Sequence, residues 1–247
     1  MPDTSARSLV VSVVSHGHGK DVQRLLEQLA RQSAAYIARV VVTHNTPEPA
    51  LREPIEGWPF AVQTLHNQIP QGFGANHNKA LKDAAEPFIC VLNPDVELLE
   101  GQEPFAALLQ AAAQPHVGCA YPRQMNSEGQ IQDSERELPS PAGLWRRRFL
   151  GRAEQRIDWV NGACVVVPTP AWRAVEGFDE GYFMYCEDVD LCLRLRLQGL
   201  TLSKAPARVI HAGQRNSHRR LRHLMWHLRS LLRLWTSVAY REIQRTK

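Results

Sequence analysis

Three carboxylates within four residues are the densest concentration of chemically reactive groups in the chain. Glu187, Asp188 and Asp190 stand directly before an apolar, arginine-bearing run that is typical of a helix. Acidic side chains stabilise a helix N-terminus, so the cluster has a purely structural interpretation. The alternative is that one carboxylate is a general base whose neighbours raise its pKa and fix its rotamer. Arg194, four residues after Asp190, would balance charge along one face of that helix.

A second set of polar residues follows apolar, β-branched runs that are typical of strands. These sites are Ser15-His16 after residues 9–14, His44-Asn45 after 39–43, Asn93-Pro94-Asp95 after 88–92, and His211 at the end of 202–211. Ligands of mostly parallel sheets bind beyond the carboxyl ends of the strands, so these side chains are candidates for a common site. Asp95 with His211 would complete a divalent-cation site that leaves its other positions to phosphate and water. A turn-forming Asn-Pro-Asp and a structural histidine are the alternative.

The elements needed to position these residues alternate along the first hundred residues. Strands are expected at 9–14, 39–43, 61–65 and 87–92, with helices at 21–32 and 76–85. This order predicts an α/β fold with a mostly parallel central sheet flanked by helices. Further along, we expect loops with a strand pair over 124–156, strands at 159–167 and 202–211, and a short helix at 170–175.

The stretch Gly72-Phe-Gly-Ala-Asn76 resembles part of a dinucleotide-binding fingerprint. His77 occupies the place of the third glycine, and the stretch is not in the first strand–turn–helix unit, so a Rossmann dehydrogenase is disfavoured. A glycine-rich turn that opens a helix still suits phosphate, because its backbone N–H groups are free.

Composition places the chain among cytoplasmic globular proteins. It has 247 residues, 44% of them hydrophobic, and no run is long enough for a membrane span or a signal-peptide core. The five cysteines include no CxxC pair, which favours buried reduced thiols over a disulfide framework or a zinc site. We therefore expect synthesis and retention in the cytoplasm.

The C-terminal tail is strongly basic, whereas the rest of the chain is mildly acidic. Residues 215–247 contain nine Lys or Arg and one Glu, a balance of +8 against +4 for the whole chain. Apolar residues recur at helical spacing from Leu221 to Ala239, with arginines beside them. This pattern predicts a helix that packs on the catalytic domain or on a second subunit, or one that lies on an anionic membrane surface. Nucleic acid is disfavoured as a partner, because no nucleic-acid-binding fold precedes the tail.

Several weak motifs occur together in one order over residues 8–213. They are the first strand with Ser15, Gln71-Gly-Phe-Gly-Ala-Asn-His-Asn78, Asn93-Pro-Asp-Val96, Asn161-Gly-Ala-Cys164, Gly177-Phe-Asp-Glu180, Phe183-Met-Tyr-Cys-Glu-Asp-Val-Asp-Leu191 and Val209-Ile-His211. As an ordered set they resemble the family-2 glycosyltransferases of the GT-A fold, in particular the rhamnosyltransferase-like branch. The resemblance implies a GT-A domain over 1–213 and a basic helical extension over 214–247.

The resemblance also implies roles for individual residues. Asp188, with Glu187, would be the base of an inverting transfer, and Asp95 with His211 would hold Mg²⁺ or Mn²⁺. Donor-binding residues would be Ser15, His16, Asn45, Gly74, Asn76, Asn78 and Asn93, and acceptor-side residues would be Asn161, Gly162 and Asp190. The donor would be a nucleotide-sugar such as dTDP-rhamnose, and the acceptor a glycan or lipid-linked hydroxyl in bacterial surface polysaccharide synthesis. The protein would then be cytoplasmic or peripheral at the inner face of the plasma membrane, with a homodimer also open.

The chain departs from the family pattern at two acidic positions. His44 stands where many relatives have an aspartate that helps to read the nucleotide base, and Asn93 replaces the first acid of the metal motif. Two alternatives stay open, the first of them because of these departures. One is a degenerate, non-catalytic relative that serves as a binding or scaffold subunit, and the other is a sugar-1-phosphate nucleotidyltransferase.

Overall fold

The structure is a computed structural model that describes residues 7–140, 156–212 and 220–245, with the side chain of Arg220 left out. The expected domain boundary at residue 213 and residues 141–155 of the expected loop region lie outside the described residues.

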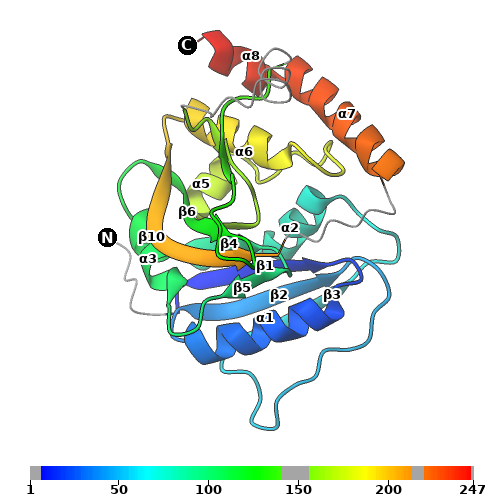
Figure 1. Cartoon of the computed structure of the whole chain (residues 1–247), viewed down its shortest axis with the longest axis vertical. Coiled ribbons are helices and arrows are strands. Elements are labelled where there is room, and N and C mark those ends of the chain that lie inside the picture. Colours follow the sequence, from blue (N-terminus) through cyan, green and yellow to red (C-terminus); the bar gives the residue numbers. More distant parts are fainter. Residues whose placement is uncertain (1–6, 141–155, 213–219, 246–247) are drawn as a thin grey trace.

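An eight-stranded sheet forms the centre of the molecule, in the order β3-β2-β1-β4-β9-β6-β10-β5 (Figure 1). Its strands are β1 (Leu9–Ser15), β2 (Ile37–His44), β3 (Ala61–His66), β4 (Phe88–Leu92), β5 (Val96–Leu98), β6 (Val117–Met125), β9 (Cys164–Pro168) and β10 (Thr201–His211). The first four strands along the chain are all parallel, as are β6 and β10, whereas β9 and β5 pair antiparallel with their neighbours. The mostly parallel sheet predicted from the sequence is confirmed.

Helices cover both faces of this sheet, and alternate residues of each strand point to one face or the other. Val11 and Val13 of β1 join a core with α1 (Gly19–Gln32) and α3 (Pro104–Ala112). Val10 joins a second core with α2 (Phe73–Leu81), α5 (Thr169–Ala174) and α6 (Glu187–Leu197). Because β1 is buried on both faces, it reads in the sequence as a continuous apolar run.

The tail forms two helices, α7 (Arg220–Thr236) and α8 (Val238–Arg245), rather than one. The break falls at Ser237, whose hydroxyl accepts a hydrogen bond from the backbone N–H of Tyr240 at 3.1 Å and so caps the start of α8. Leu231 and Leu234 of α7 pack with Tyr240 of α8 against the outer side of α6 in a third apolar cluster. Figure 1 shows both helices beyond α6, away from the sheet.

Other differences from the expected elements are local. The expected strand 159–167 is divided into β8 (Trp159–Val160) and β9 by a turn at Gly162-Ala163. β7 (Glu135–Arg136) pairs with β8, not with a second strand within 124–156 as expected. Helix α2 begins at Phe73, directly after Gly72, and not at Asn76. The five cysteines are buried and free, as predicted.

Candidate active site

Asp95 and His211 come together at the edge of the sheet. Strands β5 and β10 pair antiparallel with His211 opposite Val96, so His211 Nε2 lies 3.4 Å from Asp95 Oδ1. Both side chains are largely but not fully buried, with 15% of Asp95 and 17% of His211 exposed. Asn93 stands two residues before Asp95 in the sequence, and its Oδ1 is buried with no hydrogen-bond partner among the described residues.

These residues fit a divalent cation that is bound partly by substrate. Carboxylate, amide oxygen and imidazole are suitable ligands for Mg²⁺ or Mn²⁺, and Mg²⁺ usually binds one or two protein groups together with phosphate and water. Over the described ranges, no group of three or more His, Cys, Asp or Glu side chains is arranged as a metal site. A cation here would therefore depend on the donor diphosphate for most of its ligands.

Asn45 organises the loop before α2. Its Oδ1 accepts hydrogen bonds from the backbone N–H of Gln71 at 2.7 Å and from Asn67 Nδ2 at 2.9 Å, and its Nδ2 lies 3.2 Å from His16 Nδ1. Asn67 also donates to Asn76 Oδ1 at 2.6 Å. The expected donor residues His16, Asn45 and Asn76 are thus joined in one partly buried hydrogen-bond network.

Ser15 is buried and bonded to Glu48, a residue that the sequence reasoning missed. The Ser15 hydroxyl donates to Glu48 Oε2 at 2.7 Å, and the backbone N–H of Gly17 donates to Glu48 Oε1 at 2.8 Å. Glu48 also lies 3.8 Å from His44 Nδ1. Burial is the main cause that lowers the pKa of His44. A carboxylate four residues after His44 therefore stands close to the position where many relatives carry an acid.

Glu187 and Asp188 begin α6, and burial raises the pKa of both carboxyl groups. The second cause for Glu187 is the charge of Asp188, and Glu187 Oε2 has no hydrogen-bond partner among the described residues. Backbone N–H groups of Val189 and Gly162, at 2.8 and 3.3 Å, oppose the shift at Asp188, as does the charge of Arg136. Of the two carboxyl groups, Asp188 is therefore the more readily ionised, and Glu187 the one that more readily stays protonated.

The chain enters α6 through two strained residues. Tyr185 and Cys186 have φ angles of 74° and 66°, in the left-handed region that non-glycine residues seldom adopt. Strain of this kind occurs where the surrounding structure imposes it, often at active sites. These two residues direct the first turn of α6 toward Gly162, whose N–H donates to Asp188. A Cβ at Gly162 would lie 3.5 Å from Asp188 Cβ and 3.9 Å from Phe73 Cε1.

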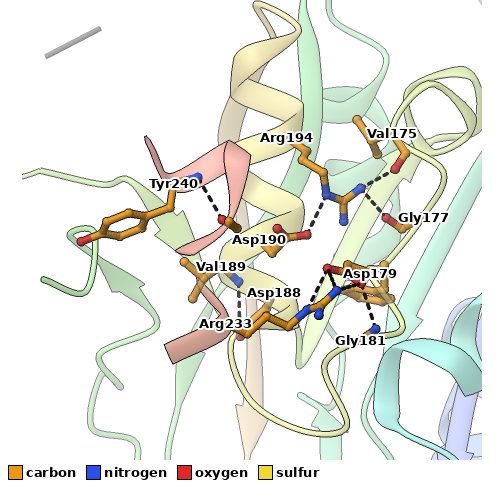
Figure 2. Close-up of polar contacts among 12 residues, drawn as sticks. Val175, Gly177, Asp179, Gly181, Asp188, Val189, Asp190, Arg194, Arg233 and Tyr240 are labelled. Carbon is orange, nitrogen blue, oxygen red and sulfur yellow. Dashed lines mark hydrogen bonds and ion pairs between the residues drawn. The ribbon is translucent and has the colours of Figure 1, made fainter. Parts of the chain in front are cut away.

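Asp190 forms a buried ion pair with Arg194. Arg194 Nε lies 2.7 Å from Asp190 Oδ2, and its Nη1 donates to the backbone carbonyls of Val175 and Gly177 (Figure 2). The charge balance expected along this helix face is thus present. The acceptor-side role of Asp190 stays a prediction, as does that of Asn161, whose amide bonds to Gln124.

Two expected donor residues, Gly74 and Asn78, lie outside the Asn45 network and contact Phe178 instead. Asn78 binds the backbone of Phe178 through both amide atoms, at 2.8 and 2.9 Å, and lines a large open hollow of about 970 Å³ between α2 and α5. A Cβ at Gly74 would lie 2.6 Å from Phe178 Cβ, so this glycine permits close packing. His77 is buried behind β1 against Ser12 Oγ at 2.8 Å, and burial lowers its pKa to about 3. These positions hold α2 in place.

A smaller cavity of about 500 Å³ is lined by Asp95 and by four of the expected donor residues, and we call it the Asp95 cavity. Residues from the strand ends, the loop before α2, the approach to α6 and helix α7 line it: Val14, His16, His18, Asn45, Thr46, Pro70, Gln71, Phe73, Asn76, Asn93, Pro94, Asp95, Phe183, Met184, Arg222, His223 and Trp226. Phe73 also lies against Gly162, which places Asp188 behind this wall. Asp95 and Asn93 line the smaller cavity and not the larger hollow, so the smaller cavity is the candidate active site.

Helix α7 supplies one wall of the Asp95 cavity and touches the entry to α6. His223 Nδ1 lies 2.7 Å from the Tyr185 hydroxyl, and the rings of Trp226 and Phe183 are 4.9 Å apart. Packing on the catalytic domain is one of the alternatives that the sequence predicts for the tail, but the sequence does not indicate that the helix lines this cavity. The signal available was the aromatic content of the tail, which by itself does not say what it packs against.

The family follows from comparison with known proteins. Residues 10–178 match the model of "Glycosyl transferase family 2". The chain belongs to this family. It is 29% identical over 234 residues to N-acetylglucosaminyl-diphospho-decaprenol L-rhamnosyltransferase of Mycobacterium tuberculosis, covering 82% of this chain and 75% of the relative. It is 27% identical over 244 residues to rhamnosyltransferase WbbL of Escherichia coli, covering 90% of each.

Solved structures show the same fold. The mannosyltransferase PcManGT from Pyrobaculum calidifontis, in complex with GDP-Man and Mn²⁺, superposes with a TM-score of 0.63 at 17% identity, over 94% of this chain and 66% of that one. GalNAc-T7 with UDP, GalNAc and Mn²⁺ gives 0.64 at 16% identity, over 85% of this chain and 44% of that one. The GT-A fold and glycosyltransferase activity expected from the sequence are confirmed. None of the helices in the described ranges is long and apolar enough to span a membrane.

Proposed function

We propose that this glycosyltransferase moves a sugar, with inversion, from a nucleoside-diphosphate-sugar to a hydroxyl of a lipid-linked glycan acceptor in surface polysaccharide synthesis. The donor is proposed to be dTDP-L-rhamnose. Two relatives that cover most of the chain are rhamnosyltransferases by name, and one of those names specifies a diphospho-decaprenol-linked substrate. A lipid-linked acceptor would bring the protein to the inner face of the plasma membrane.

The observation that carries the proposal is that the Asp95 cavity lies next to the segment that holds Asp188. Asp95, beside His211, lies on its wall, and Phe73 connects that wall to Gly162 and Asp188. A transferase needs one place for the diphosphate and another for the acceptor hydroxyl, on opposite sides of the anomeric carbon. Family membership favours this reaction over a nucleotidyltransferase or a non-catalytic scaffold.

In the proposed mechanism Asp188 is the general base. Its carboxylate removes the proton from the acceptor hydroxyl while the oxygen of that hydroxyl bonds to the anomeric carbon, and the bond from this carbon to the diphosphate breaks with its electrons. The N–H groups of Gly162 and Val189 keep the carboxylate ionised and fix its direction. Glu187, buried beside it, accepts negative charge poorly and therefore holds a proton more readily than Asp188 does.

Asp95 and His211 would hold a divalent cation, and Asn93 lines the same cavity as Asp95. When bound, such a cation supplies positive charge to the diphosphate leaving group. Asn45, Asn67 and Asn76 keep the loop before α2 in one conformation, so the backbone at the start of α2 is fixed for donor contacts.

A thermal-shift panel tests the donor assignment. Nucleoside diphosphates and sugar nucleotides are added with Mn²⁺ and, in parallel, with EDTA, because a ligand that binds only the folded state raises the unfolding temperature. We expect dTDP and dTDP-rhamnose to stabilise the protein more with Mn²⁺ than with EDTA. Stabilisation by a different nucleotide would assign the donor to that nucleotide instead of dTDP. No stabilisation by any nucleotide would contradict the proposed donor site.

A further inference from the structure

Helix α7 has two faces with different surroundings. Toward the protein it presents His223 and Trp226 to the Asp95 cavity and buries Ser230, Leu231 and Leu234. On the opposite side lies a row of exposed apolar side chains at spacings of three and four, which places them along one face of the helix. We call this row the α7 outer face: Leu221, Leu224, Met225, Leu228 and Leu232.

The exposure of this row is high for its residue types. Leu221 is 80% exposed, Met225 65% and Leu232 61%. Single apolar residues on a surface need no explanation, but contiguous apolar rows of this kind mark contact sites for partners or membranes. The inner residues already hold α7 on the protein, so the outer face is not needed for folding of the domain.

The charges of α7 indicate what this face contacts. The helix contains four arginines and no acidic residue. Arg233 pairs with Asp179 at 2.8 Å, and Arg222 stacks on Trp226 at 4.9 Å, at the rim of the cavity. Arg229 lies on the same flank of the row as Arg222 and has no ion-pair partner among the described residues. An apolar row bordered by arginines matches acyl chains below and anionic headgroups beside it.

We propose that the α7 outer face docks on an anionic lipid surface. The position of the helix gives this contact a consequence for the reaction, and in this respect the inference rests on the proposed function. Because Arg222, His223 and Trp226 line the Asp95 cavity, docking of the opposite side of α7 holds the cavity rim at the headgroup level. A lipid-linked acceptor then reaches Asp188 without leaving the membrane.

A second copy of the chain fits this face less well. A stable protein interface buries about 800 Å² on each partner, which is more than one row on a single helix supplies. Two copies of α7 laid face to face would also bring their arginines together without acidic partners, and such like-charge contacts are unfavourable.

The test measures co-sedimentation of the full chain with phosphatidylcholine vesicles, with and without phosphatidylglycerol. We expect the protein to bind only the vesicles that contain phosphatidylglycerol. Met225→Glu or Leu228→Glu should decrease this binding about tenfold or more. Arg229→Gln should decrease it about fivefold. Ile55→Glu, at an apolar residue of still higher exposure on the loop between β2 and β3, is the control and should bind like the wild type. Binding that Met225→Glu and Leu228→Glu both leave unchanged would overturn the proposal.

Two further readouts distinguish lipid docking from self-association and from loss of the fold. Light scattering without lipid should give a monomer mass, and a dimer that Leu228→Glu dissociates would assign the face to a second copy and overturn the lipid assignment. Thermal unfolding and nucleotide-dependent stabilisation should be unchanged in Met225→Glu and Leu228→Glu, which shows that fold and cavity are intact. If vesicle binding behaves as expected but no nucleotide binds, the proposed function fails while the docking surface stands.

Discussion

The Nε2 atom of His211 lies 3.4 Å from the Oδ1 atom of Asp95, although the two residues are far apart in the sequence. The contact is set by strand pairing, because His211 at the end of β10 lies opposite Val96 at the start of β5. Both side chains are thereby held on backbone that cannot rearrange without opening the sheet. This rigidity is what a site for a diphosphate and its cation requires.

Asp95→Ala and His211→Ala should each weaken nucleotide binding and remove its dependence on Mn²⁺. Loss of one protein ligand from a site with so few leaves the cation held mainly by phosphate and water. Calorimetric titration with dTDP, in Mn²⁺ and in EDTA, measures both effects. Asp83→Ala, an exposed carboxylate on the chain segment after α2, is the control and should bind like the wild type. Unchanged Mn²⁺ dependence in Asp95→Ala would remove this residue from the cation site.

Glu187→Gln should leave the acidic limb of the pH–rate profile in place, because Glu187 holds its proton more tightly than Asp188 and is still neutral when Asp188 ionises. Burial raises the pKa of Asp188, and the base must be ionised, so kcat should fall as pH drops through a range above that of ordinary carboxyl groups. A large shift of this limb in Glu187→Gln would mean that Glu187 ionises before Asp188.

Stability gives a second check on Glu187. A carboxyl with a raised pKa favours the folded state at low pH, and this contribution is lost as pH rises through the folded pKa, about 8 for Glu187. Glu187→Gln should therefore flatten the decrease in unfolding free energy with rising pH, and an unchanged decrease would contradict the raised pKa of Glu187.

Arg194→Ala should lower the free energy of unfolding by about 3–5 kcal/mol, because it leaves Asp190 as a buried charge without its partner. The carbonyls of Val175 and Gly177 also lose their donor. Urea denaturation measures the change. Arg245→Ala breaks an exposed pair with Glu242 and should cost less than about 1 kcal/mol. Equal effects of the two substitutions would mean that the buried pair contributes no more than a surface pair.

Two glycine substitutions should have opposite effects on stability and activity. Gly74→Ala places a Cβ 2.6 Å from Phe178 Cβ and should destabilise the fold by about 1–3 kcal/mol through overpacking. Gly162→Ala meets only ordinary contacts, at 3.5 Å from Asp188 and 3.9 Å from Phe73, so stability should be kept while transfer slows. Thermal unfolding and steady-state rates together test the pair. A stable, inactive Gly74→Ala would instead support a direct donor contact at this position.

The sequence predicts the strand-end residues well, because period and β-branching identify β1, β2 and β4, and parallel strands place their carboxyl ends together. The sequence does not predict the contacts that side chains on loops and very short strands make with these residues. Glu48 reaches Ser15 and Gly17 from beyond the end of β2, and Arg136 approaches Asp188 from a two-residue strand. Periodicity gives no signal for such segments. Gly74 and Asn78 match the motif, yet the structure uses both against Phe178, because the same residue types serve turns and helix packing.

The tail shows the limit of amphipathic patterns. Its apolar residues form one apparent stripe in the sequence, but the structure divides them between the cluster on α6 and the α7 outer face. A helical pattern reports which residues share a face, and only the packed structure reports which part of that face has a neighbour.

The assignment of Asp188 as the base is tested most directly by comparing the wild type with Asp188→Asn in transfer of labelled rhamnose from dTDP-rhamnose to a membrane lipid fraction. Donor binding is measured on the same preparations by calorimetry. We predict that Asp188→Asn binds dTDP as the wild type does but labels lipid about 10²- to 10⁴-fold more slowly, the range associated with loss of a general base. Transfer near the wild-type rate by a folded Asp188→Asn would contradict the mechanism.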